Sequence, residues 1–151
     1  MIQVEFKKTP QILILAQSIG EKLGSYYAIH VRRGDRLERN KILQTCTRPQ
    51  NIFNRIKNII PLGEKLYILS NEWQVDYFDF LRNYYEVYQY FDFDELKELL
   101  REDNYYLYSV EEQILQNAKI KFDTFKPRQG GHPYYLCDEY KNQWAKIKKN
   151  M

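Results

Sequence analysis

Apolar residues recur along the chain in two alternating patterns, one typical of helices and one typical of buried strands. Residues 12–23 carry apolar side chains at helical spacing, after a Thr9-Pro10 pair that suits the first turn of a helix. The next apolar run, 26–31, is short and has the length of a strand. The two patterns then alternate to the end of the chain, which predicts strands joined by helices.

The pattern predicts four strands, with a helix before the first and helical segments after each. Strands are expected at residues 26–31, 66–69, 87–90 and 119–122. Helices are expected at residues 10–23, from Thr47 and Pro49 until Pro61, and at 73–84, 95–101, 104–114 and 135–147. Such alternation is typical of a parallel sheet covered by helices on both faces. With 151 residues, too few for two independent cores, the sequence predicts one Rossmann-like α/β domain over 1–151.

Composition and charge narrow the function classes. The net charge is +3, from 23 basic and 20 acidic side chains, which is too balanced for bulk nucleic-acid binding. No apolar run reaches membrane-spanning length and the first residues lack a signal-peptide core, so we expect a cytoplasmic chain without a membrane span. Cys46 and Cys137 lack metal-ligand spacing and are expected to be reduced thiols. Trp73 and Trp144 are expected in the core, and His132 in a surface loop.

Arginines gather in one stretch, residues 32–39, directly after the first expected strand. Ligands of open α/β sheets bind at the carboxyl ends of the strands, and this stretch falls at such an end. The guanidinium groups of Arg32 and Arg33 suit phosphate oxygens, and Gly34 lets the chain turn closely around a ligand. From the residues alone, a charged, solvated turn with His30 in the core is an equal alternative.

The run HVRRGD at residues 30–35 resembles the donor-site motif of GDP-fucose-dependent fucosyltransferases, which include the α1,2-, α1,6- and protein O-fucosyltransferases. The resemblance implies that Arg32 and Arg33 bind the donor diphosphate and offset the charge that develops on the departing GDP. It also implies supporting roles in donor binding for His30, Gly34 and Asp35.

Two later segments resemble further parts of the same donor site, in the same order. LYILSNE at 66–72 resembles the strand that ends beside the donor, and SVEEQILQNAKIKFDTF at 109–125 resembles the helix, strand and Thr-Phe turn that hold the nucleotide. The chain departs from the family at 126–127, where Lys-Pro replaces a small polar run. The donor-binding residues implied by these segments are Ser70, Asn71, Glu112 (or its neighbour Glu111), Thr124 and Phe125.

By this resemblance the chain is the C-terminal, donor-binding half of a GT-B glycosyltransferase. The implied reaction transfers a sugar, in this family fucose, from a GDP-sugar to an acceptor hydroxyl, without a metal or another cofactor. These enzymes have two Rossmann-like domains, so a second domain or subunit is expected to supply the acceptor site. The alternatives are a module that binds a nucleotide sugar without transferring it, or one half of a two-chain transferase. A small RNA- or DNA-binding protein is disfavoured by the balanced charge.

Overall fold

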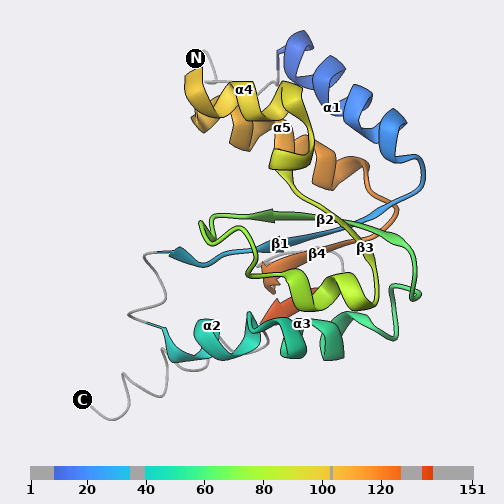
Figure 1. Cartoon of the computed structure of the whole chain (residues 1–151), viewed down its shortest axis with the longest axis vertical. Helices are drawn as coiled ribbons and strands as arrows, with labels where there is room; N and C mark the ends of the chain where they lie inside the picture. Colours follow the sequence, from blue (N-terminus) through green and yellow to red (C-terminus); the bar gives the residue numbers. More distant parts are fainter. Residues whose placement is uncertain (1–8, 35–39, 103, 127–133, 138–151) are drawn as a thin grey trace, which may run out of the picture.

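The computed structural model describes residues 9–34, 40–102, 104–126 and 134–137, without the side chains of 100–102. Its centre is a sheet of five parallel strands in the order β3-β2-β1-β4-β5 (Figure 1). The strands are β1 (Tyr27–Val31), β2 (Lys65–Ser70), β3 (Glu86–Tyr88), β4 (Lys121–Phe125) and β5 (Tyr135–Cys137). The parallel sheet and the helices that flank it confirm the predicted Rossmann-like α/β fold.

Helices cover both faces of the sheet, as Figure 1 shows. The helices are α1 (Pro10–Leu23), α2 (Lys41–Cys46), α3 (Pro49–Ile56), α4 (Asp94–Glu102) and α5 (Asn104–Asn117), with short 3₁₀ turns η2 (Asp79–Asn83) and η3 (Tyr90–Asp92). Helices α1, α4 and α5 lie on one face, and α2, α3 and η2 lie on the other. None of the helices in the described part of the chain is long and apolar enough to cross a membrane.

The central strand β1 is apolar on both sides because both of its faces are covered. Ile29 and Val31 belong to the core beneath α2 and α3, whereas Ala28 belongs to the core beneath α1 and α5. Neighbouring strand residues point to opposite faces, so a strand covered twice reads as a continuous apolar run. This is the pattern that made residues 26–31 recognisable as a strand.

The strand order reverses between β1 and β4. From β1 the chain moves outward through β2 to β3, and then returns through α4 and α5 to place β4 on the other side of β1. In open α/β sheets the crevice at such a reversal, outside the carboxyl ends of the strands, is where ligands bind. A ligand site is therefore expected at the carboxyl ends of β1 and β4.

One observed helix was not expected, and one helix expected in the described part of the chain is absent. A helix at 41–46 was not expected, although Asn40 caps it by accepting a hydrogen bond of 3.0 Å from the Leu43 N–H. Instead of a helix over 73–84, the chain forms turns followed by the short η2. Trp73, expected in the core, is 89% exposed because no helix turns its side chain inward.

The segment from Tyr135 forms strand β5, and not the start of a helix. It pairs with β4 in parallel, with Asp123 opposite Tyr135 and Phe125 opposite Cys137. Pairing with a preformed sheet edge decides its conformation, and that contact is remote in sequence. The rest of the expected helix, with Trp144, and the loop residue His132 lie outside the described residues.

Cys46 and Cys137 form a disulfide, so the expectation of two reduced thiols was wrong. The Cα atoms of the two residues lie 5.5 Å apart, because β5 places its last residue beside the end of α2. The two cysteines are 91 residues apart in sequence, and only the fold brings them together.

Candidate functional site

The carboxyl ends of β1, β2 and β4 bring three sequence-predicted segments to one edge of the sheet. His30–Gly34 end and follow β1, Ser70–Glu72 end and follow β2, and Thr124–Phe125 end β4. The expected strand at 119–122 in fact runs over Lys121–Phe125, so Thr124 and Phe125 lie within it. Hydrogen bonds connect these segments to one another, and they decide what each side chain can do.

Thr124 ties β4 to the end of β1. Its hydroxyl donates to the His30 carbonyl at 2.6 Å and accepts from the Arg32 N–H at 2.9 Å. The residue is 3% exposed. A hydroxyl has one proton to donate, and this proton is used within the protein. In this arrangement the Thr124 hydroxyl joins β4 to the end of β1.

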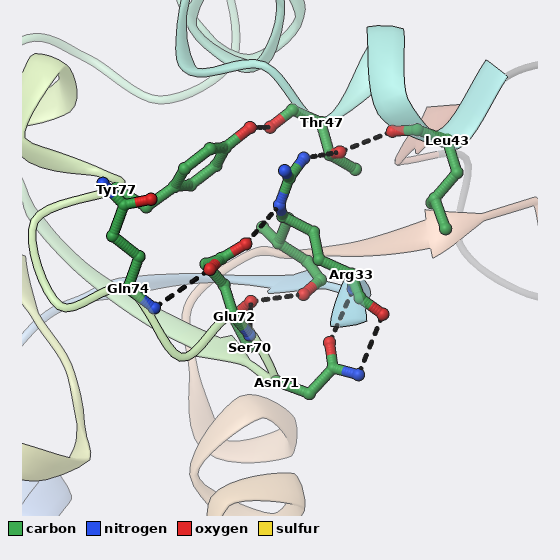
Figure 2. Close-up of polar contacts among 9 residues, drawn as sticks. Arg33, Leu43, Thr47, Ser70, Asn71, Glu72, Gln74 and Tyr77 are labelled. Carbon is green, nitrogen blue, oxygen red and sulfur yellow. Dashed lines mark hydrogen bonds and ion pairs between the residues drawn. The ribbon is translucent and has the colours of Figure 1, made fainter. Parts of the chain in front are cut away.

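Arg33 lies at the centre of a second network, on the side of the sheet covered by α2 and α3 (Figure 2). Its Nε donates to the Glu72 carboxylate at 2.8 Å, and its Nη1 donates to the Thr47 hydroxyl at 2.6 Å. The guanidinium carbon also lies 4.0 Å from the ring centroid of Tyr77. With the Arg33 side chain 11% exposed and that of Glu72 7% exposed, this is a largely buried and compensated charge.

Asn71 fixes the backbone that carries the two arginines. Its side-chain oxygen accepts from the Arg33 N–H, and its side-chain nitrogen donates to the Arg33 carbonyl at 3.0 Å (Figure 2). Gly34 follows at φ +74°, where a Cβ would come within 2.7 Å of the Asn71 amide nitrogen. The turn therefore requires glycine for both its conformation and its space.

Ser70 connects β2 to β1 and orients the residue that pairs with Arg33. The Ser70 hydroxyl donates to the Val31 carbonyl at 2.6 Å and accepts from the Glu72 N–H at 3.0 Å. A second oxygen of the Glu72 carboxylate accepts from the Gln74 N–H at 2.9 Å. Ser70 and Asn71, predicted to bind the donor, thus hold the walls of the site in the structure.

Arg32 differs from Arg33 in having a donor that is not used. Its Nε is buried and has no hydrogen-bond partner among the described residues. Neighbouring residues point to opposite sides, so Arg32 shares the α5 side of the sheet with His30, as the sequence predicted. A buried N–H without a partner costs roughly 1–3 kcal/mol, and more for a charged group. Such a group at the reversal of strand order is the strongest indication of a ligand site in the described chain.

His30 and Tyr108 lie beside Arg32 on that side. Their rings meet edge-on, with centroids 6.5 Å apart. Burial lowers the pKa of His30, the Asp123 carboxylate opposes this, and the charge of Arg32 adds to it. His30 is therefore neutral at pH 7 and leaves Arg32 as the cation there. Sequence reasoning missed Tyr108, which is 43% exposed and stands on the helix that precedes β4.

The two acidic residues of α5 have different environments. Glu112 is half-buried, and its charge raises the pKa of Tyr108 further than burial does alone, which places it at the rim of the crevice. Glu111 is 5% exposed and accepts a hydrogen bond of 2.6 Å from the Tyr67 hydroxyl. Burial raises the pKa of Glu111 to about 7. Glu111 thus belongs to the core, and the donor-binding role expected for Glu112 stays a prediction.

The two remaining predicted residues are Phe125 and Asp35. Phe125 is half-buried and packs against the core beneath α2 and α3, and Asp35 lies outside the described residues. Among the residues that the structure describes, no group of three or more His, Cys, Asp or Glu side chains could hold a metal ion. A cavity of about 630 Å³ lies between α2, α3 and β5, and neither Arg32 nor Arg33 lines it.

Compared with known proteins, the chain matches no family model, and no curated protein shows significant sequence similarity to it. The proposed function therefore rests on the residues and geometry at the carboxyl ends of β1, β2 and β4.

Proposed function

We propose that the chain binds the diphosphate of a nucleotide sugar in the crevice between the ends of β1 and β4. In this proposal it is the donor-binding domain of a metal-independent glycosyltransferase, with GDP-fucose as donor in view of the HVRRGD motif. The observation that carries the proposal is the buried Nε of Arg32, which has no partner in the described chain and lies where the strand order reverses.

The chemistry of transfer suits this placement of Arg32. As the bond between the sugar and the diphosphate breaks, negative charge builds on the departing diphosphate. A cation held in advance at that point stabilises the transition state more than the ground state. The Arg32 backbone is held by Thr124, and the neutral His30 on the same side of the sheet adds no second positive charge beside its guanidinium.

The two arginines take different roles in this proposal. Arg33 is already compensated by Glu72 and held by Thr47 and Tyr77, so it positions the loop and its neighbour. Arg32 contacts the diphosphate. This division modifies the expectation from the motif, in which both guanidinium groups bind phosphate.

The proposal also concerns the source of the acceptor site and the cellular compartment of the chain. A second domain or subunit supplies the acceptor site, as in the two-domain enzymes that the motif resembles. The cytoplasmic location expected from the sequence stays a prediction, and the disulfide argues against it because such bonds are typical of oxidising compartments.

A thermal-shift screen of nucleotides and nucleotide sugars tests the proposal. GDP and GDP-fucose are expected to raise Tm, because a ligand that binds only the folded state stabilises it. Arg32→Ala should abolish the shift. Lys119→Ala is the matched control, since this exposed lysine precedes β4 at the opposite edge of the sheet and its loss should leave the shift intact.

Donor hydrolysis and transfer assays on the same samples separate an enzyme from a binding module. Turnover of GDP-fucose supports the transferase, whereas binding without turnover limits the function to donor binding in this chain. If no nucleotide shifts Tm, or if Arg32→Ala responds as the wild type does, the crevice is not a diphosphate site.

A further inference from the structure

The Cys46–Cys137 disulfide joins two of the smallest elements of the fold. Cys46 is the last residue of α2, which has six residues, and Cys137 is the last residue of β5, which has three. A helix of this length is not stable without tertiary contacts, and among the described strands β5 pairs with β4 alone. The disulfide thus ties the end of α2 to the end of β5.

The cavity between α2, α3 and β5 gives access to the disulfide. It has a volume of about 630 Å³, and Cys46 and Leu136 are among its lining residues. Cys46 is half-buried, whereas Cys137 is 1% exposed. Cys46 is thus the more exposed cysteine of the pair. Lys41 and Arg55 also line the cavity, so its charge favours an anionic reagent.

The residue after Cys46 holds Arg33. Thr47 is fully buried, and its hydroxyl accepts from Arg33 Nη1 at 2.6 Å while donating to the Leu43 carbonyl (Figure 2). Its own carbonyl accepts from the Tyr77 hydroxyl at 2.9 Å. A shift of the end of α2 therefore moves an oxygen that the guanidinium of Arg33 depends on.

We propose that small anionic thiols exchange with the Cys46–Cys137 disulfide through this cavity, and that the exchange controls the order of the Arg33 network. A thiolate attacks Cys46 Sγ and forms a mixed disulfide with it, while Cys137 Sγ leaves as a thiolate and takes up a proton. A second thiolate attacks the small-molecule sulfur of the mixed disulfide and releases Cys46 as a thiol. Two thiols are oxidised to one small-molecule disulfide, and the protein gains two electrons and two protons.

The consequence for donor binding rests on the proposed function. Reduction releases the end of α2 from β5, loosens Thr47, and weakens one of the contacts that hold Arg33 beside Glu72. The loop that carries Arg32 then loses its fixed geometry. Binding of a diphosphate is expected to weaken about tenfold, the factor that corresponds to loss of a single hydrogen bond to a charged group.

The access route is tested by the rate of reduction with three thiols of similar size: 2-mercaptoethanesulfonate, 2-mercaptoethanol and cysteamine. The chain has two cysteines, so alkylation and intact mass distinguish the disulfide with no free thiol, the mixed disulfide with one, and the reduced protein with two. At equal thiolate concentration and low salt, the sulfonate should react about tenfold faster than the cationic cysteamine. Lys41→Glu should narrow or reverse this order. An order that does not depend on thiol charge overturns the anionic-thiol assignment.

The coupling to Arg33 is tested by amide hydrogen exchange on oxidised and reduced wild-type protein, without nucleotide. Amides of residues 43–49 should exchange at least about tenfold faster after reduction, whereas β1 and β2 should be unchanged. Cys46→Ser/Cys137→Ser should match the reduced protein. Equal exchange in the two redox states overturns the coupling. GDP titration of both states is a separate arm: failure to bind in either state contradicts the proposed function and leaves the redox coupling standing.

Discussion

The Thr124 hydroxyl donates a hydrogen bond of 2.6 Å to the carbonyl of His30. The same oxygen accepts from the N–H of Arg32, so one buried side chain of β4 holds the end of β1 at two points. These contacts lie where the strand order reverses, which is the place where α/β sheets bind their ligands. The end of β1 is thus fixed to β4 by bonds within the protein.

Replacement of Thr124 by Val keeps the shape of the side chain and removes both hydrogen bonds. The His30 carbonyl and the Arg32 N–H lose their partner in a buried place, which should cost about 1–3 kcal/mol of unfolding free energy. Urea unfolding measures this, and Thr124→Ser, which retains the hydroxyl, is the control. Equal stability of the Val variant and the wild type would show that these bonds do not hold β1 to β4.

Removal of Arg33 should act mainly on stability. Arg33→Ala leaves the Glu72 carboxylate largely buried without its cation, and breaking such a pair costs on the order of 3 kcal/mol. Glu72→Gln in the same background should recover part of the loss, because the uncompensated charge is gone. Denaturant unfolding of the single and double variants measures the coupling. Additive effects would contradict the pairing of these two side chains.

Gly34 should tolerate alanine less well than another glycine with positive φ. Gly34 and Gly63 have φ of +74° and +86°, so alanine is strained at both. Only at Gly34 would the new Cβ meet a neighbour, the Asn71 amide nitrogen. Gly34→Ala should therefore cost roughly 1 kcal/mol more than Gly63→Ala, the worth of one hydrogen bond. Thermal unfolding compares them, and equal losses would exclude a role for Asn71 in the turn.

Glu111 should make stability fall as the pH rises. Its pKa is raised by burial from 4.5 to about 7 in the folded protein, so the folded state holds its proton more tightly than the unfolded state. This pKa difference contributes up to ~3 kcal/mol to the free energy of unfolding. The contribution is fully present below pH about 4.5 and is lost as the pH rises through about 7. Glu111→Gln retains an acceptor for Tyr67 and cannot titrate.

The measurement is the difference in unfolding free energy between wild type and Glu111→Gln at pH 4.5 and pH 8. Other groups titrate in both proteins and cancel in the difference. The wild type should lose stability relative to the variant over this range. A constant difference would mean that Glu111 is not buried as a protonated acid.

The sheet could be predicted because its strands are covered on both faces. Continuous apolar runs such as those at 26–31 and 66–69 are readable in sequence, and their alternation with helices leaves few other folds. The helix expected from residue 135 and the two reduced thiols expected at Cys46 and Cys137 were wrong for a different reason. β5 forms because an edge of β4 is open to it, and the disulfide forms because β5 then lies beside α2. Both depend on contacts between residues far apart in sequence.

The sequence indicated where the two arginines lie in the fold but not the contacts that distinguish them. The sequence places Arg32 and Arg33 at the end of a strand, and strand alternation sends them to opposite faces. What it does not show is that Glu72 and Thr47, from other elements, compensate and hold Arg33 alone. Tyr108 was missed for the same reason, since its place beside His30 depends on how α5 packs across the sheet.

The most direct test of the diphosphate site is calorimetric titration of GDP into wild type, Arg32→Ala and Lys119→Ala. The wild type and the Lys119 variant should bind with equal affinity. Loss of one charge-assisted contact of about 1.5–3 kcal/mol predicts that Arg32→Ala binds about 10- to 100-fold more weakly. Its stability should be unchanged or improved, because it removes a buried donor that has no partner in the described chain. Equal GDP affinity in Arg32→Ala and wild type would contradict the assignment of this crevice to a diphosphate.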